Sequence, residues 1–536
     1  NTIENAPDQG MGLTQLTSGA GPNLISGNVL SNTGRFGITL TLPDGTGLDS
    51  GDGSIVVEDN TVTRPASPTS TDTRDVSGIA VIRRAYAPSA GESDVTTGVV
   101  IRNNTVTGWV PVSGSPNDGF GIVVEGTKSH VYGNTVTGSD IGIQLQAGND
   151  GYPGDSNQNA TNDFFSRGNA QNTCVDLGSN TLSGNAVGTR SVSNPAGQIL
   201  DAGVHNTTQG TDYCSIQAAI DAADPGDSIS VDPGSYAENV VINKSLTLSG
   251  PFAGTAGFDA SRDGTGEAVI SPATGRAVRI NADDVVFDGF TVQNVNDTAI
   301  SSGANYGGGS DNVQVINNRV LDVHDGSALY TNGPVGTVSN WTVAHNLMRN
   351  IESSIGSGIN LWKVNAGTIT DNVVEDSAFG GIQVNQGSDV EISNNTISNT
   401  AHNGINVAVS SNVQVFGNTI TGANSSGTAD EAGLTLYGGS SNVTMMCNSV
   451  SGSGRNGFST ASAITDPYSN IRIFDNAITV PYDISHNLAQ GLVIGSNWYG
   501  GSAPSVDGSN SAGVQVADPL AATPIGTPTC NNPAPA

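Results

Sequence analysis

The feature that most constrains the fold is a short repeat, in which an alternating apolar run leads into an Asn and then into a second apolar or Thr-led run. In its most regular stretch the Asn recurs as Asn372, Asn395 and Asn418, a spacing of 23 residues each time. A Gly-Ile step lies in each interval, at residues 381–382 and 404–405. A period of this length with alternating apolar residues and no helical pattern predicts a β-solenoid. In such a fold each repeat is one coil that buries its inward side chains by stacking on its neighbours.

The recurring Asn is predicted to occupy one fixed turn of every coil. Asn can adopt the left-handed backbone conformation that most residues avoid, and stacked Asn side chains can hydrogen-bond from one coil to the next. The positions expected to stack in this way are Asn318, Asn346, Asn372, Asn395, Asn418, Asn448 and Asn476.

Through its I-x-N-N-T-I and G-I-x-V units, the chain resembles the right-handed parallel β-helix repeat proteins of the pectate-lyase-like superfamily. The resemblance covers nearly the whole chain and implies an all-β fold made of parallel β-helix coils. It implies little about activity, because the superfamily includes lyases, hydrolases, epimerases, phage fibres and adhesins. No characterised enzyme family is matched closely.

The second half of the chain opens differently from the first. Residues 213–226 carry apolar side chains at helical spacing, with Ser215 as the N-cap and a Pro-Gly step as the stop, which predicts a capping helix at 215–223. We therefore expect two consecutive solenoid blocks. The predicted divisions are a β-helix at 1–200 with long lateral loops and an uncapped N-terminal end, a linker at 201–211, a second β-helix at 212–520, and a Pro-rich tail at 521–536.

Composition excludes some classes of partner. The 48 acidic and 18 basic residues give a net charge of −30, which disfavours nucleic acid and anionic membrane surfaces as partners. No apolar run approaches the roughly 20 residues that span a bilayer. The chain starts with neither Met nor a signal-peptide pattern, so we interpret it as a mature or excised segment.

The four cysteines lack the C-x-x-C spacing of a zinc site. We expect two disulfides, although the sequence leaves their connectivity open: a bond between Cys174 and Cys214 would join the two blocks, and a bond between Cys447 and Cys530 would hold the tail against the solenoid. Four free thiols are the alternative. Disulfides indicate an oxidising setting, so the predicted location is extracellular or at the cell surface.

No cofactor is required by any motif, and Ca²⁺ is the one candidate. Residues 44–53 combine Asp44, Asp49 and Asp52 with four Gly, which gives oxygen ligands on a flexible backbone, as a hard cation needs. A weaker candidate contains Asp263 and Glu267. Ordinary Asp-Gly turns are the alternative interpretation of both segments.

The superfamily's enzymes act on acidic polysaccharides in a lateral groove, but the catalytic motifs of its methylesterases, polygalacturonases and alginate epimerases are absent here. Counting positions within the coil gives one column that contains His324, Gly356, Phe379, His402, Glu431 and Arg455. Weak acid–base candidates near this column are His324, Asp325, His345 and His402, since these side chains can exchange protons near neutral pH. The alternative is that they are ordinary polar residues of exposed turns.

Two functional hypotheses follow from these observations. The first is a non-catalytic extracellular structural or adhesive protein that self-associates head to tail into a filament, because an uncapped coil exposes unpaired strand edges. The second is a secreted carbohydrate-active enzyme, a polysaccharide lyase, hydrolase or epimerase that works in a lateral groove. The expected partners are a second copy of the chain or a surface polysaccharide.

Overall fold

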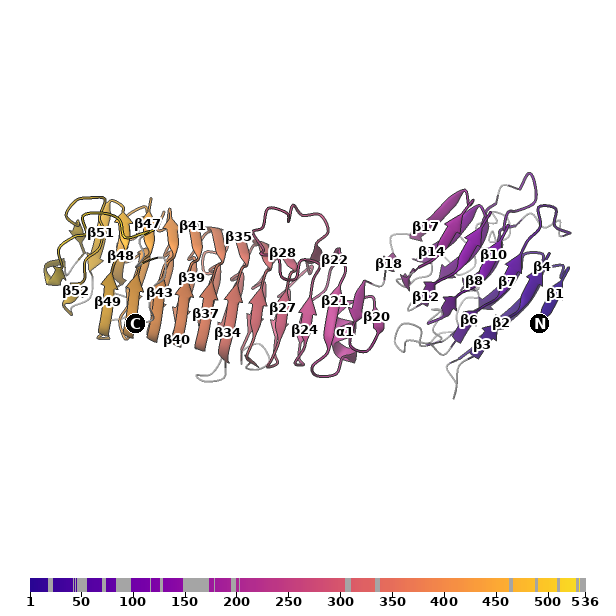
Figure 1. Cartoon of the computed structure of the whole chain (residues 1–536), viewed down its shortest axis with the longest axis horizontal. Coiled ribbons are helices and arrows are strands. Elements are labelled where there is room, and N and C mark those ends of the chain that lie inside the picture. Colours follow the sequence, from indigo (N-terminus) through magenta and orange to yellow (C-terminus); the bar gives the residue numbers. More distant parts are fainter. Residues whose placement is uncertain are drawn as a thin grey trace. The chain divides into compact units, whose positions relative to one another are not determined.

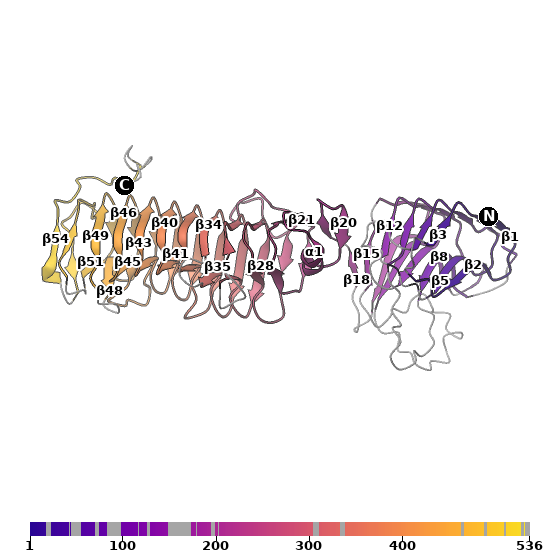
Figure 2. The ribbon, with the colours of Figure 1, turned by 90° about the horizontal axis from the view of Figure 1, so that it is seen from below.

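The structure, a computed structural model, is built from parallel strands that stack into three sheets in each of two compact units, Asn1–Ala218 and Ala219–Ala536 (Figures 1 and 2). It describes residues 1–17, 23–41, 43, 45, 55–69, 74–82, 98–115, 117–125, 129–147, 173–177, 179–193, 199–201, 203–303, 310–332, 338–461, 466–486, 490–508, 511–526 and 530. Each sheet is named below after its first strand.

The first unit contains three sheets of six strands each. The β1 sheet consists of β1 (Thr2–Glu4), β4 (Val29–Ser31), β7 (Thr61–Thr63), β10 (Thr105–Thr107), β13 (Thr135–Thr137) and β16 (Thr181–Ser183). The β2 sheet consists of β2 (Gln9–Thr14), β5 (Phe36–Thr41), β8 (Val76–Ile82), β11 (Gly119–Glu125), β14 (Ile141–Ala147) and β17 (Val187–Ser193). The β3 sheet consists of β3 (Asn23–Ser26), β6 (Ile55–Glu58), β9 (Val100–Arg102), β12 (Ser129–Tyr132), β15 (Thr173–Asp176) and β18 (Ile199–Asp201). Each coil therefore contributes one strand to every sheet.

A short hairpin and a helix follow the first set of coils. Strands β19 (Val204–Asn206) and β20 (Thr211–Tyr213) pair antiparallel. Helix α1 (Ile216–Ala222) comes next, and the Oγ of Ser215 accepts the backbone N–H of Ala218 at 3.1 Å. Ser215 thus satisfies one of the free N–H groups of the first turn, as an N-cap does.

The second unit again contains three stacks of parallel strands. The parallel strands of the β21 sheet are β21 (Ser228–Val231), β24 (Thr247–Ser249), β27 (Val286–Asp288), β31 (Gln314–Ile316), β34 (Val338–Ala344), β37 (Asn365–Thr370), β40 (Ser388–Ser393), β43 (Ser411–Phe416), β46 (Ser441–Met446) and β49 (Ser469–Phe474), with β30 (Ser310–Asp311) also paired to β34. The β22 sheet consists of β22 (Gly234–Tyr236), β25 (Ala268–Ile270), β28 (Thr291–Val295), β32 (Arg319–Val323), β35 (Leu347–Ile351), β38 (Val373–Ser377), β41 (Thr396–Thr400), β44 (Thr419–Thr421), β47 (Ser449–Ser451) and β50 (Ala477–Thr479).

The β23 sheet positions the candidate site described below. It consists of β23 (Val240–Ile242), β26 (Val278–Ile280), β29 (Ile300–Ser302), β33 (Leu329–Asn332), β36 (Ile359–Trp362), β39 (Ile382–Asn385), β42 (Ile405–Ala408), β45 (Ala432–Tyr437), β48 (Asn456–Ala461), β51 (Tyr482–His486) and β53 (Val506–Asp507). Near the C-terminus, β52 (Leu492–Ile494) pairs with β54 (Val514–Val516), and a 3-10 turn, η4, spans Ser511–Gly513.

The core of the second unit is made of inward-facing aliphatic side chains that repeat from coil to coil. Ile359, Ile382 and Ile405 lie in register on neighbouring strands and are fully buried. The predicted fold class, all-β with parallel β-helix coils and one short helix, is confirmed. In the described residues no helix combines the length and apolarity that a membrane crossing requires.

The seven predicted Asn residues form one continuous ladder along the second unit. Asn372, for example, donates from its backbone N and its Nδ2 to the Oδ1 of Asn395, at 3.0 and 2.9 Å, and Asn395 binds Asn418 in the same way. These side chains are buried. The backbone differs from the prediction in one respect: the left-handed residue is the one before the ladder Asn, such as Asp371 or Asn394. The ladder Asn itself is thereby free to turn its amide inward.

The structure joins Cys447 to Cys530 in a disulfide, so the described part of the tail is held against the coil that contains Cys447. Cys214 is also disulfide-bonded. The side chain of Cys174, its predicted partner, lies outside the described part of the structure.

A buried histidine near the C-terminal end of the coils is expected to make stability depend on pH. The Nε2 of His486 donates to the carbonyl of Gln490 at 2.7 Å, and its Nδ1 lies 2.8 Å from the Oγ1 of Thr460. Burial lowers the pKa of His486 below its ordinary value of 6.5, although the bond to Gln490 opposes this effect. Below that pH the unfolded chain binds a proton that the folded chain excludes, so the free energy of unfolding falls as the pH falls.

We therefore expect the melting temperature of the native protein to fall between about pH 7.5 and about pH 5.5, and to fall less in a His486→Gln variant. Differential scanning calorimetry at both pH values measures this difference. An equal fall in both proteins would show that His486 is not the group responsible.

Candidate functional site

The structure gives three of the four predicted acid–base residues separate surroundings. The Nδ1 of His324 lies 2.9 Å from a carboxylate oxygen of Glu352, and both side chains are exposed. The Oγ of Ser353 lies 3.5 Å from the Oδ1 of Asp325, at the limit of a hydrogen bond. His345 is a turn residue in the left-handed backbone conformation, with φ of 58°. These contacts do not assemble a shared acid–base centre around His324.

The fourth candidate, His402, has closer neighbours. Its ring lies 4.7 Å from the ring of Phe379, and its Nδ1 lies 2.7 Å from a carboxylate oxygen of Glu431. The predicted column is thus correct for these three residues. It differs at His324, which lies beside Glu352, because the link from β35 to β36 has seven residues and the link from β32 to β33 has five.

The predicted calcium segments give no assembled site in the described residues. Asp44, Asp49 and Asp52 lie outside them. Asp263 accepts the backbone N–H and the hydroxyl of Thr265, at 2.9 and 2.6 Å, and these bonds lower the pKa of its carboxyl. Glu267 is paired with Arg262 at 2.7 Å. The described residues hold no group of three or more His, Cys, Asp or Glu placed to bind a metal, and calcium binding stays a prediction.

Sequence reasoning missed the most organised polar surface, which covers the outer face of the β23 sheet. Side chains alternate between the two faces of a strand, so the residues between the buried aliphatic positions point outward. One outward row, aligned by strand pairing, contains Arg279, Ser301, Tyr330, Asn360, Gln383, Asn406, Thr435, Ser459 and Ser485. A second row, two residues further along each strand, contains Asn332, Trp362, Asn385 and Ala408 on β33 to β42, and Tyr437 on β45. We call these two rows the polar face.

Carboxamides occupy the centre of the polar face. Asn360, Gln383 and Asn406 follow one another on β36, β39 and β42, and each is largely buried. The Nδ2 of Asn385 reaches the Oδ1 of Asn360 at 3.3 Å and the Oε1 of Gln383 at 3.4 Å. Each carboxamide offers both donors and acceptors. The row therefore matches a ligand with many hydroxyl groups.

Aromatic rings flank these amides. The rings of Tyr330 and Trp362 lie 6.4 Å apart, edge to face at 81°. The Nε1 of Trp362 and the Oδ1 of Asn406 are buried and make no hydrogen bond. A buried polar atom left unpaired costs about 1–3 kcal/mol, so a ligand hydroxyl or a water that reached either atom would be bound favourably.

Three titratable side chains, Glu431, His402 and Tyr437, lie close together further along the same face. We call them the acidic cluster. The Glu431 carboxylate contacts His402. Burial raises the pKa of the nearby Tyr437 phenol, and the negative charge of Glu431 adds to that increase. Tyr437 also hydrogen-bonds to the side chain of Asn403, which accepts the hydroxyl of Thr435. The arrangement places a carboxylate, an imidazole and a phenol next to the amide row.

The connection between β44 and β45 fixes the position of Glu431. The hydroxyl of Ser459 donates to the carbonyl of Asp430 at 2.8 Å, and the hydroxyl of Ser485 donates to the carbonyl of Ala429 at 3.0 Å. The Nδ2 of Asn456 also donates to the Ala429 carbonyl, at 2.9 Å. These three bonds come from β48 and β51, so the acidic cluster rests on a preorganised support.

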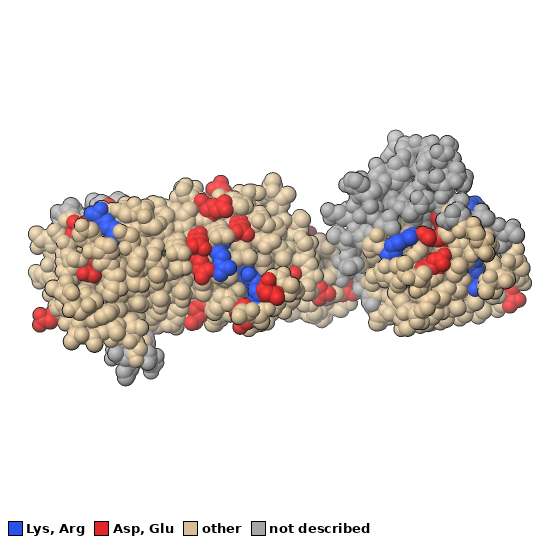
Figure 3. Space-filling model, turned by 90° about the horizontal axis from the view of Figure 1, so that it is seen from above, with Lys and Arg blue, Asp and Glu red and all other residues tan. Residues whose placement is uncertain are grey.

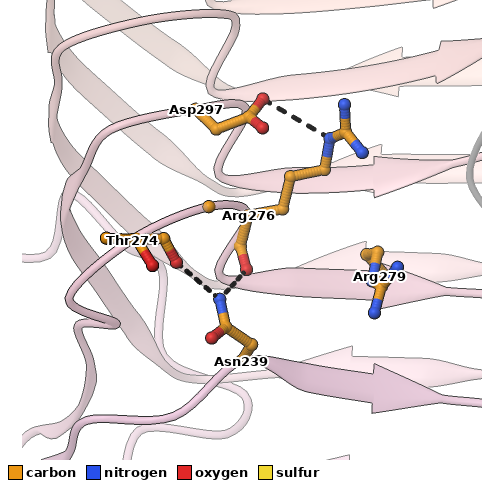
Figure 4. Close-up of a pocket in the computed structure, with 6 residues that line it drawn as sticks. Asn239, Thr274, Arg276, Arg279 and Asp297 are labelled. Carbon is orange, nitrogen blue, oxygen red and sulfur yellow. Dashed lines mark hydrogen bonds and ion pairs between the residues drawn. The ribbon is translucent and has the colours of Figure 1, made fainter.

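A cavity of about 350 Å³ lies at the opposite end of the polar face, beside β26 (Figure 4). The Nδ2 of Asn239 donates to the carbonyls of Thr274 and Arg276, at 2.9 and 2.6 Å. The guanidinium of Arg276 lies 3.4 Å from Asp297. Figure 4 shows Arg279 apart from this ion pair, and among the described residues Arg279 has no ion-pair partner.

Comparison with known proteins agrees with the strand topology. Residues 270–450 match a family described as "Right handed beta helix region". The fold of this chain is a right-handed parallel β-helix. No curated protein matches the sequence of this β-helix protein.

Several solved structures are similar to the β-helix protein at low identity. The catalytic unit of a GH87 alpha-1,3-glucanase from Streptomyces thermodiastaticus is 14% identical with a TM-score of 0.35, over 78% of this chain and 62% of that unit. A mannuronan C-5 epimerase module from Azotobacter vinelandii is 12% identical with a TM-score of 0.22, over 94% and 92%. PfbA, a surface adhesin of Streptococcus pneumoniae, is 11% identical with a TM-score of 0.25, over 78% and 85%. These scores are too low to support an argument about function.

The amide row has a signal in the sequence. Each of its three central residues follows a Gly-Ile step, at 358–360, 381–383 and 404–406. The Ile belongs to the core, so the next residue must point outward. An Asn or Gln at that same position in three successive coils therefore predicts a row of carboxamides on the outer face.

Proposed function

We propose that this β-helix protein is an extracellular polysaccharide-binding protein and that the polysaccharide lies along the polar face of the second unit. The observation that carries the proposal is the row of Asn360, Gln383 and Asn406, with the Tyr330 and Trp362 rings beside it. Binding sites for small organic groups combine apolar surface with a few polar groups in fixed positions. This face has both.

The shape of the face supports a chain-like ligand. Neighbouring strands lie about 4.8 Å apart, so the four coils from Tyr330 to Asn406 extend over roughly 14 Å. That length exceeds one sugar ring. The amides repeat along the coil axis, so successive sugars would meet similar groups. The Cys447–Cys530 disulfide supports a location outside the cytosol.

A second candidate function is cleavage or modification of the bound polysaccharide. It is favoured by the contact between His402 and Glu431 beside the Tyr437 phenol. A carboxylate and an imidazole can act as general acid and base. In this reading Glu431 acts on the glycosidic linkage or on the sugar, and the amide row holds the neighbouring sugars.

The binding proposal predicts that replacing Trp362 with Ala weakens polysaccharide binding by about tenfold or more, which is the loss of ~1.4 kcal/mol or more. The reason is that the substitution removes the ring and its unpaired Nε1 from beside the amide row. Affinity electrophoresis of the full chain against a panel of neutral and acidic polysaccharides would measure the change. Release of sugars or of unsaturated products in the same mixtures would identify the enzymatic function.

The matched control is Thr368→Ala on β37, which changes a partly exposed side chain on the β21 sheet of the same coil. Its affinity should equal that of the native protein. The proposal fails if no polysaccharide binds, or if both variants bind as the native protein does. The filament predicted from the sequence stays a separate prediction, and negative-stain electron microscopy would test it.

A further inference from the structure

A second cavity, of about 350 Å³, lies on the outer face of the β22 sheet. Its floor is formed by β32, β35, β38 and the first residue of β41, Thr396, and one wall is formed by the long connection between β24 and β25. Figure 3 looks onto this face and shows acidic and basic side chains gathered in a band across part of the second unit. The cavity and the polar face belong to different sheets, so neither depends on the other.

The wall of this cavity is held by a buried ion pair. The guanidinium of Arg262 binds both carboxylate oxygens of Glu267, at 3.1 and 2.7 Å, and the two side chains are only 0% and 2% exposed. Arg262 also donates to the carbonyls of Asn317 and Phe290, at 2.5 and 3.2 Å. The backbone N–H of Gly257 donates to the carbonyl of His345 at 2.7 Å. The connection is therefore fixed to the coils, and the cavity is preorganised.

The guanidinium and carboxylate groups of the cavity are planar, and only some of their hydrogen-bonding atoms have partners. The Nε and Nη2 of Arg349 both bind the Oε2 of Glu375, at 2.8 and 2.7 Å, so the other carboxylate oxygen makes none of these bonds. The Nε of Arg319 is buried without a hydrogen-bond partner. Phe258 lies on the wall with 43% of its surface exposed. An exposed ring beside a guanidinium–carboxylate pair combines an apolar surface with aligned donors and acceptors.

Charge decides which ligand class fits. Each guanidinium around the cavity has a carboxylate close to it: Arg262 pairs with Glu267, Arg349 pairs with Glu375, and Asp263 interacts with Arg319. Because the arginines are matched by carboxylates, and Asp259 also lines the cavity, an anionic ligand gains little from the local field. A neutral ligand that presents adjacent hydroxyl groups and one apolar side satisfies both the Arg349–Glu375 pair and the Phe258 ring.

We propose that this cavity is a second carbohydrate site, which takes a neutral sugar ring stacked on Phe258 with its hydroxyl groups bound by Arg349 and Glu375. Saturation-transfer NMR of the full chain tests this, with the methyl glycosides of glucose, galactose, mannose and xylose as neutral probes and methyl glucuronide as the acidic one. At least one neutral glycoside should bind. Phe258→Ala and Glu375→Gln should each weaken that binding by about tenfold or more.

Two further variants separate this site from the rest of the molecule. Ser398→Ala changes the residue that pairs with Glu375 one coil further along, outside the cavity, and should leave binding unchanged. Thr368→Ala changes a side chain on the β21 sheet, outside both the cavity and the polar face, and should also leave binding unchanged. Because Phe258 and Trp362 lie on different sheets, Phe258→Ala tests this cavity and Trp362→Ala tests the polar face, so failure of one proposal does not imply failure of the other. The proposal is overturned if no neutral glycoside binds, if glucuronide alone binds, or if binding survives both cavity variants.

Discussion

Arg262→Met is expected to destabilise the second unit by about 3–5 kcal/mol, since removing one partner of a buried ion pair leaves the other charge unpaired in the interior. In the native protein the Glu267 carboxylate is 2% exposed and accepts two bonds from Arg262 and one from Thr291. Arg319 reaches Glu267 only at 3.5 Å, so it cannot replace Arg262 without moving. Thermal unfolding followed by circular dichroism would measure the loss.

The matched control for this variant is Arg349→Met on the same sheet. Arg349 also pairs with a carboxylate, Glu375, but its side chain is 42% exposed, and exposed pairs contribute about 0–1 kcal/mol. A second variant, Arg262→Met combined with Glu267→Gln, should recover part of the stability because no unpaired charge remains. Equal losses of stability for Arg262→Met and Arg349→Met would contradict the conclusion that the buried ion pair holds the connection between β24 and β25.

The second large effect is expected for Asn395→Ala, which should cost about 2–4 kcal/mol because several buried groups lose their partners, at about 1–3 kcal/mol for each one left unsatisfied. The Oδ1 of Asn395 accepts two bonds from Asn372, and its Nδ2 donates to the carbonyl of Ile369 and to Asn418. Alanine cannot make any of these bonds. The coils depend on their immediate neighbours, so the damage should be centred on the two adjoining coils.

Differential scanning calorimetry would give the shift in melting temperature for this variant. Asn296→Ala is the control, because Asn296 is exposed and lies outside the ladder. Hydrogen exchange would locate the effect, with faster exchange expected at the amides of β38 to β44. Similar melting shifts for the two Asn variants would contradict the assignment of Asn395 to the ladder.

The fold could be predicted from the sequence because the same interactions stabilise every coil. The alternating aliphatic residues and the stacked Asn side chains act locally, so a regular spacing is enough to assign them. The sequence pattern predicts the left-handed conformation one position too late, at Asn372 instead of Asp371, for example. Both residue types tolerate that conformation, and the pattern alone could not separate two adjacent turn positions.

The candidate site was harder to predict because it depends on insertions. His402, Phe379 and Glu431 could be aligned by counting, but His324 could not, because one connection is two residues longer than its neighbour. The cavity on the β22 sheet depends on a connection folding back across several coils. No local sequence pattern predicts that the connection between β24 and β25 packs against these later coils.

The most direct test of the central claim is a crystal structure of the full chain with an oligosaccharide of the polysaccharide that binds most tightly. We expect electron density for sugar rings along the polar face, in contact with Trp362, Asn360 and Gln383. Density confined to the first unit, to the β21 sheet or to the cavity beside Phe258 would contradict it.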